Sequence, residues 1–568
     1  MMSRRLLMSL TVAAVMGLSA GCSSSATSSQ PSGSAITPSL APSEQSVAPS
    51  EQATATTASV ARPLVVVLVA ADIGTLDPGE NWYGGGTYIL ADVYDRLFKM
   101  GGSPAAPQPL LAAEVPTTAN GGISADGATY TIKLKPGAKF HDGTPVDASA
   151  VVFSFNRINS LKLGPEAVSA HWITKAEAVD PLTVRFTLSQ PLGDFVAALA
   201  SGWGGYIVSP TAIKAHEVAG DSAHAWLLTH DAGSGPYEIA QADTAAKQVT
   251  LQRVGDYWGG WSDGPHVESA ILRWGLDSAT ARLLLERGDA DVAIGLAPSD
   301  FSQVQKDSGI VASSYPGLYQ VNIDFNNSTA PFNDLKVRQA MQYSFDQATI
   351  NKTIYGGLLG SMVGVIAAGY PEAYPVTTTF PFNLATAKQL LSEAGYNASN
   401  PLQFTVSPLH FWGEDSEVLQ FWQSELATIG VKMTIRETDV ATFETAWSGC
   451  NANTTPNIAQ AFTGGVEGDY LSGWDALWDA YYHVPCNTFY SQDAAATALL
   501  LKIPQLSDPS ARKPLMTQLN QILTDDAQTI WLGTVPGLLA MRDVVQGYVY
   551  TDLNDATYLP LSVMSLTK

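Results

Sequence analysis

Residues 138–148, AKFHDGTPVDA, place a tight turn directly before a helix start. The glycine and proline of this stretch favour a turn between Phe140 and Pro145. Before it, residues 128–134 alternate apolar and polar side chains, as a half-buried strand does. After it, Asp147 is a suitable N-cap, and apolar residues follow at helical spacing: Val151, Val152 and Phe155. The sequence therefore predicts strand, turn and helix in succession.

The same mixture of signals continues along the chain. Residues 63–69 form a β-branched run of strand length, and residues 183–188 alternate polar and apolar side chains, as in a further strand. Asp334 and Asn383 are each placed to cap a helix. A helix expected at 417–429 is followed by the strand 431–435, and helix followed by strand at this spacing is an α/β unit. We therefore predict an α/β protein.

The N-terminal sequence has the pattern of an export signal. Two arginines precede the apolar segment Leu6–Leu18, which has the length of a signal peptide and is short for a membrane span. Leu18–Cys22 looks like a bacterial lipobox, so we expect a signal peptide at 1–21 and a lipid on Cys22; an ordinary secretory peptide with an unrelated cysteine is the alternative. Residues 22–62, rich in Ser, Ala, Thr and Pro, read as a disordered tether.

The net charge limits the possible binding partners, and the cysteines limit the possible cross-links and metal sites. The chain has a formal charge of −22, which argues against nucleic acid and against docking on anionic lipid headgroups. Membrane attachment would therefore depend on the lipid anchor. Cys450 and Cys486 form an even pair in an exported protein, which favours a disulfide, with two free buried thiols as the alternative. Their spacing gives no zinc motif.

The sequence gives no positive support for catalysis. The nearest approach to a nucleophile elbow, residues 232–235, lacks the first glycine and leads into Pro236. The sequence contains neither a P-loop nor a dinucleotide-binding glycine motif after a strand, and His216–Glu217 has no second histidine one turn later. We therefore expect no enzyme activity, no cofactor and no metal site; an envelope-anchored hydrolase is the alternative from another class.

The stretch 138–148, with Val151–Ser154 after it, resembles the signature of the solute-binding proteins of ABC importers in family 5, which handle peptides, nickel and oligosaccharides. Further blocks agree with this family in order and spacing: Thr75–Pro78, Val93–Leu97, Gly233–Tyr237, Asp256–Trp258, Leu285–Val292 and Pro331–Ala340. Physically these blocks read as scaffold, and we expect Gly233–Pro236 to lie near a hinge.

The resemblance implies a bilobed α/β fold of the periplasmic-binding-protein type (type II, cluster C) with an additional third domain and a two-strand hinge. The ligand would lie between lobes I and III, and their closure would be the signal read by the membrane permease. The implied division is lobe I at 63–103, 209–322 and 538–568, lobe II at 104–208, and lobe III at 323–537.

The resemblance also suggests ligand contacts. In the family an acidic residue meets a peptide's ammonium group, and Asp469 in the segment Gly464–Tyr470 is the candidate here, although the family's tryptophan before the acid is missing. Further candidates follow from their positions: Trp412, Trp474, Trp82, Tyr83, Tyr319 and Asn322. We expect a monomer at the extracytoplasmic face of the membrane or in the periplasm, binding a peptide. Alternatives are an oligosaccharide, a nickel or haem complex, or a sensory or chaperone-like lipoprotein without a permease.

Overall fold

The structure is a computed structural model. It describes residues 62–69, 72–81, 84–102, 105–410, 413–438, 442, 459–481, 493–549 and 559–567. Residues 62–568 belong to one compact unit. The predicted signal peptide, the tether, Cys22, Cys450 and Cys486 lie outside the described residues. Among the helices that are described, none is long and apolar enough to cross a membrane.

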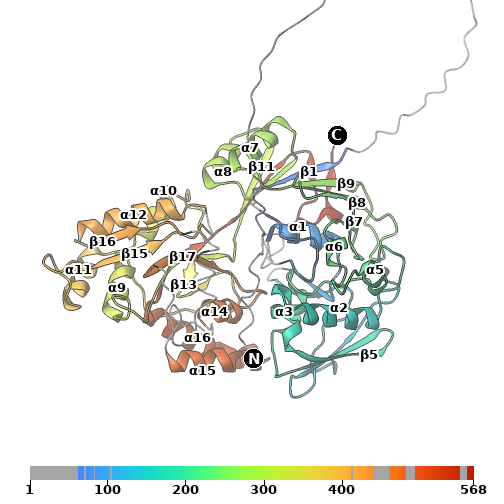
Figure 1. Cartoon of the computed structure of the whole chain (residues 1–568), viewed down its shortest axis with the longest axis horizontal. Helices are drawn as coiled ribbons and strands as arrows, with labels where there is room; N and C mark the ends of the chain where they lie inside the picture. Colours follow the sequence, from blue (N-terminus) through green and yellow to red (C-terminus); the bar gives the residue numbers. More distant parts are fainter. Residues whose placement is uncertain are drawn as a thin grey trace, which may run out of the picture. The chain divides into compact units, whose positions relative to one another are not determined.

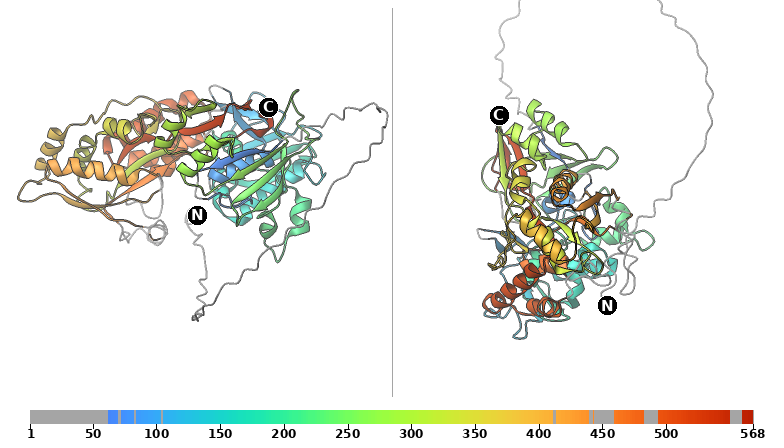
Figure 2. Two further views of the ribbon diagram at one scale, coloured as in Figure 1. Left: turned by 90° about the horizontal axis from the view of Figure 1, so that it is seen from above. Right: turned by 90° about the vertical axis from the view of Figure 1, so that its left-hand side faces the viewer.

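A seven-stranded mixed sheet contains the predicted first strand near its centre (Figure 1). Figure 2 shows this sheet from above, with blue β1 beside green strands. β1 is parallel to both of its neighbours. The strand order is β11 (Ile310–Tyr315), β19 (Gly537–Arg542), β10 (Val292–Ile294), β1 (Leu64–Leu68), β9 (Ser269–Arg273), β8 (Gln248–Arg253) and β7 (Tyr237–Asp243).

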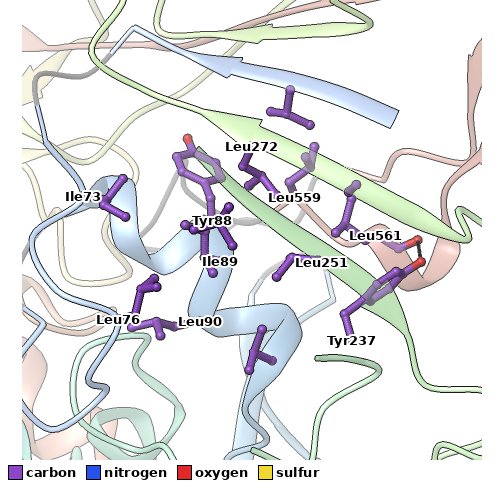
Figure 3. Close-up of a cluster of buried hydrophobic side chains, with 14 of the residues drawn as sticks. Ile73, Leu76, Tyr88, Ile89, Leu90, Tyr237, Leu251, Leu272, Leu559 and Leu561 are labelled. Atoms are coloured by element: carbon purple, nitrogen blue, oxygen red, sulfur yellow. Dashed lines mark hydrogen bonds between the residues drawn. The ribbon is translucent and has the colours of Figure 1, made fainter. Parts of the chain in front are cut away.

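Both faces of this sheet are buried, which explains the uninterrupted β-branched run of β1. On one face α1 (Gly84–Val93) places Ile89 in a buried cluster with Leu251 and Leu272, and Leu90 lies beside Leu76 in the same cluster (Figure 3). The Tyr237 hydroxyl donates to the Leu561 carbonyl across 3.2 Å in this cluster. The other face carries α7 (Ser278–Arg287) and α8 (Pro298–Val304). Two short helices also belong to this region: α5 (Pro210–His216) and α6 (His224–Leu227).

The stretch 138–148 joins a smaller sheet to its covering helix, as predicted. Gly143 has φ +82°, which suits the tight turn. The Asp147 carboxylate accepts the Ala150 N–H at 2.9 Å and so caps α2 (Ala148–Leu161). The elements of this region are β4 (Thr129–Lys133), β6 (Thr183–Leu188), β5 (Ile173–Asp180), the pair β2 (Phe98–Gly101) and β3 (Ala106–Pro109), α3 (Gly164–Val168), η1 (Ala170–Trp172) and α4 (Phe195–Ala200).

A five-stranded mixed sheet has the order β16 (Lys432–Ile435), β15 (Gln403–Ser407), β17 (Ala461–Val466), β12 (Gln320–Phe325) and β18 (Thr529–Thr534). The predicted caps Asp334 and Asn383 are confirmed, because each side chain accepts a backbone N–H at a helix start. The helices around this sheet are α9 (Leu335–Tyr343), α10 (Gln347–Thr353), α11 (Leu384–Glu393), α12 (Asp415–Thr428), α14 (Gly473–Tyr481), α15 (Ala494–Lys502) and α16 (Pro509–Asp526). Short elements complete the described fold: β13 (Met362–Val363), β14 (Ile366–Ala367), η2 (Ile503–Gln505), β20 (Val545–Gln546), η3 (Leu561–Val563) and β21 (Ser565–Leu566).

The chain passes from the seven-stranded to the five-stranded sheet between β11 and β12, and it returns between β18 and β19. We call the described residues of 62–315 and 537–567 the first half, and those of 320–534 the second half. The two crossing segments touch, since the Val535 N–H donates to the Tyr319 carbonyl at 2.9 Å. A Cβ on Gly317 would lie 1.8 Å from the Val535 oxygen, so only glycine fits this approach.

Gly233 and Gly235, in the segment that we expected near a hinge, approach the end of α1 closely. A Cβ on Gly233 would lie 2.0 Å from the Val93 carbonyl oxygen, and one on Gly235 would lie 2.4 Å from that of Asp92. Gly233 and Gly235 therefore allow a loop to pack on the C-terminal end of α1.

Candidate functional site

Residues 189–206 of the first half lie against residues 466–478 and 500–512 of the second half, with Val168, Tyr370 and Glu372 beside them, and we call this contact region the junction. One buried apolar cluster has members from both sides of it. The first half contributes Val168, Ala198 and Trp203, and the second half contributes aromatic residues among others: Tyr370, Tyr470, Trp474 and Trp478. Because apolar surface from both halves is removed from water here, the junction stabilises the arrangement in which they meet.

Asp469, the predicted partner of a ligand ammonium group, lies in this junction with 7% of its surface exposed. Its carbonyl accepts the Ser201 hydroxyl of the first half at 2.6 Å. Its N–H donates to the Asp475 carboxylate in the first turn of α14. The preceding Gly468 N–H donates to the Tyr370 hydroxyl at 2.8 Å. The backbone around Asp469 is thus held by both halves.

An ionic cluster lies beside it. Arg512 of α16 donates two hydrogen bonds to Asp194 of the first half, and Nη2 to Oδ2 measures 2.8 Å. Arg512 Nη2 also lies 3.2 Å from Glu372 Oε1. The Ser472 hydroxyl donates to Asp194 Oδ2 at 2.8 Å, and the Gly473 N–H donates to Glu372 Oε2 at the same distance. Burial, with the nearby charge of Asp194, raises the pKa of Glu372.

Three other predicted ligand residues are described, and two of them lie at β12. Tyr319 precedes this strand, and its ring lies against Gly465, where a Cβ would be 2.2 Å from the hydroxyl. Asn322 is 4% exposed and donates to both Asp324 oxygens at 3.2 Å. Its own Oδ1 has no hydrogen-bond partner within the described part of the chain. Trp474 is 1% exposed and donates to the Leu500 carbonyl at 2.8 Å, as a core side chain does.

Of the predicted residues that the structure describes, only Asn322 lies within a strand, β12, where it faces Gly464 of β17; Tyr319 directly precedes β12, and Asp469 follows the end of β17. Trp82, Tyr83 and Trp412 lie outside the described residues. Sequence reasoning missed the junction residues Asp194, Ser201, Glu372, Ser472 and Arg512. Nothing in their local sequence distinguishes them, since each matters only through a partner distant in the chain.

A cavity of about 360 Å³ lies away from these residues. His141 and Asp142 of the turn stretch line it, together with Ser209, Trp226 and Asp231. It includes none of the residues predicted to contact ligand.

Comparison with known proteins identifies the family. Residues 106–483 match the model described as bacterial extracellular solute-binding proteins, family 5 Middle. The chain belongs to this family. The glutathione-binding protein GsiB of Shigella flexneri is 30% identical over 379 residues, which are 66% of this chain and 69% of the relative.

Solved structures share the fold of this family-5 protein. The ABC transporter substrate-binding protein CtaP of Listeria monocytogenes has a TM-score of 0.75 at 23% identity, over 89% of this chain and 99% of that one. DppA of Helicobacter pylori, in complex with peptide STSA, has a TM-score of 0.72 at 24% identity, over 89% of this chain and 98% of that one. NikA of Brucella suis, in complex with Fe(III)-EDTA, has a TM-score of 0.76 at 18% identity, over 89% of this chain and 100% of that one. The predicted bilobed α/β fold class is confirmed.

Three of the sequence blocks that carry the family-5 resemblance contact one another in the folded chain. Asp95, from the block Val93–Leu97, accepts the Ser234 hydroxyl at 3.0 Å, the Tyr257 hydroxyl at 3.1 Å and the Trp258 indole N–H at 2.7 Å. Three blocks far apart in the sequence are therefore joined at one buried carboxylate. Burial raises the pKa of Asp95, and these three donors act in the opposite direction. These bonds fix the three blocks against one another in the fold.

Proposed function

We propose that this family-5 protein is a lipid-anchored extracytoplasmic receptor that binds a peptide between two closing lobes and delivers it unaltered to an ABC permease. The lipid on Cys22, the tether, the Cys450–Cys486 disulfide, the monomeric state and the division into lobes I, II and III belong to this proposal. Binding by closure works because contacts from both lobes are available only when they meet, so the ligand shifts the population toward the closed form.

The observation that carries the proposal is the position of Asp469. This buried acidic residue lies where the two halves meet, and Ser201 of the first half binds its carbonyl. A carboxylate shielded from bulk water would favour a ligand cation such as a peptide's N-terminal ammonium. The names of two similar proteins, one glutathione-binding and one in complex with a peptide, agree with a peptide-like ligand.

Native mass spectrometry of the protein purified from its host tests the ligand class. We expect a co-purified peptide with an intact backbone. Recovery of an oligosaccharide or of a nickel or haem complex would replace the peptide while keeping the binding function. Recovery of a bound solute that the protein cleaves on incubation would contradict a transport receptor.

A second test concerns Asp469 directly. Asp469→Asn should weaken the binding of free-amine peptides much more than that of the same peptides N-acetylated, measured by calorimetry. Glu467→Gln is the matched control, because it removes one negative charge from the same segment. Equal losses for both peptide forms, or a selective loss in the Glu467 variant alone, would remove Asp469 from this role.

A further inference from the structure

We propose that Asp194 and Arg512 form a latch that favours the closed state, and that Asp194, with Ser201, positions the segment 469–473 only when the halves meet. The proposal rests on the function proposed above and names residues that would regulate its closing step. It follows from bonds that cross the junction between the two halves.

The latch bonds join residues that lie outside the two covalent crossings. Asp194 receives two hydrogen bonds from Arg512 and one from Ser472, and all three donors belong to the second half. A backbone bond lies next to them, from the Gly193 N–H to the Pro504 carbonyl at 2.8 Å. Because the chain connects the halves near Gly317 and Val535, a rotation there that separates the halves must break these bonds.

The burial of the pair explains why it would respond to closure. The side chains of Arg512 and Asp194 are 6% and 14% exposed. When the halves separate, both charges regain water, so the intact pair contributes only a modest net free energy to closure. When Asp194 is neutralised, the buried Arg512 of the closed state keeps, among the described residues, only Glu372 of its own half, at 3.2 Å, as an acidic partner, whereas in the open state water can hydrate it. A single substitution should therefore favour opening selectively.

Gly193 gives an independent constraint on the same contact. A Cβ at this position would lie 2.2 Å from the Leu506 carbonyl oxygen of the second half. All three atoms that it would approach most closely belong to Leu506 and Ser507. An alanine at position 193 would thus obstruct the junction without removing a charge. In the separated state the same methyl group would meet no such obstacle.

Hydrogen–deuterium exchange of the full-length protein without added ligand tests the latch. In Asp194→Asn and Gly193→Ala, amides of residues 189–206, which include the bonded Gly193 N–H, should exchange about tenfold faster or more, as expected for a shifted opening equilibrium. Amides of β1 and β9 should be unchanged. Asp300→Asn is the matched control, because it breaks an ion pair inside the first half, between Arg282 and Asp300 at 3.0 Å. The junction amides of this variant should exchange as in the wild type.

Unchanged junction exchange in both latch variants would overturn the proposal and make the pair a static part of the fold. If Asp194→Asn loses its fold, Gly193→Ala decides alone: faster exchange confined to the junction supports the latch, and uniformly faster exchange overturns it. Calorimetry with reduced glutathione and trialanine as probes separates the two proposals. If neither probe binds the wild type, the peptide function is in question, while the exchange result still decides the latch.

Discussion

Arg157 donates two hydrogen bonds to Asp77, at 2.8 Å and 2.6 Å, and both side chains are almost completely buried. Asp77 comes from the block Thr75–Pro78, and Arg157 comes from α2, which begins after the stretch 138–148. The pair therefore joins the loop after β1 to the helix whose start the turn stretch positions. A guanidinium that matches both carboxylate oxygens has the strongest ion-pair geometry available to side chains.

Arg157→Leu should destabilise the protein by about 3 to 5 kcal/mol, because among the described basic groups the buried Asp77 carboxylate then keeps only the longer contact with His224, at 3.6 Å. Urea unfolding followed by circular dichroism measures this loss. Lys133→Ala is the control, since Lys133 and Glu114 form an exposed pair at 3.4 Å whose loss should cost less than about 1 kcal/mol. Similar losses in the two variants would show that the buried pair contributes little.

The protonation of His141, in the turn stretch, should make the stability of the protein depend on pH. Its Nδ1 lies 2.6 Å from Asp231 Oδ1 and its Nε2 lies 2.9 Å from the Gly235 carbonyl, and since both partners are acceptors the ring carries two protons. Burial disfavours the charged ring, but the hydrogen bond and charge of Asp231 outweigh it, so the pKa of His141 is raised.

The sign of the effect follows from this raised pKa. The stabilisation is fully present below the ordinary histidine pKa of about 6.5 and is lost as the pH rises through the folded value. Wild-type stability from urea unfolding should therefore decrease above this pH. His141→Gln and Asp231→Asn should each flatten this decrease, and an unchanged slope in both would contradict a charged His141.

Asp324 is an acidic residue whose replacement should raise the stability of the protein at alkaline pH. Burial raises the pKa of Asp324 to about 7, although hydrogen bonds from Thr529 and Asn322 partly offset it. The folded state therefore holds a proton that the unfolded chain releases near pH 4, and stability falls as the pH rises from about 4 to about 7.

Asp324→Asn should consequently stabilise the protein at pH 8 by about 1 to 4 kcal/mol, since each pKa unit corresponds to about 1.4 kcal/mol. The new amide could also donate to Asn322 Oδ1, which lacks a partner within the described residues. At pH 4 the variant and the wild type should be nearly equal. Thermal melts at both pH values measure the difference; a variant less stable at pH 8 would show that the native carboxylate is ionised at little cost.

Gly317 should be intolerant of a side chain. Gly317→Ala would place a methyl group 1.8 Å from the Val535 oxygen, which must shift one crossing segment against the other. We expect a loss of a few kcal/mol in unfolding free energy, in the range found for overpacked sites. Gly255→Ala is the control, because a Cβ there meets nothing within 4 Å. If both variants unfold alike, the close approach of the crossing segments is not required.

The sequence by itself determined the local elements. Asp147, Asp334 and Asn383 were predicted as helix caps and are helix caps, because a cap depends on a backbone N–H two or three residues away. The strand at 64–68 was predictable for a related reason, since a β-branched run suits a strand buried on both faces. The resemblance added the family, which the match over residues 106–483 confirms.

Only the tertiary structure decided which side chains meet across the junction. Asp194 and Arg512 are separated by 318 positions, and Ser201 and Asp469 by 268. Such pairs leave no periodicity or spacing in a single sequence, because their energies depend on burial and distance after the chain has folded. Local conformation depends on neighbouring residues in the sequence. The contacts that would regulate closure form only when charged and polar groups distant in the sequence are buried against one another.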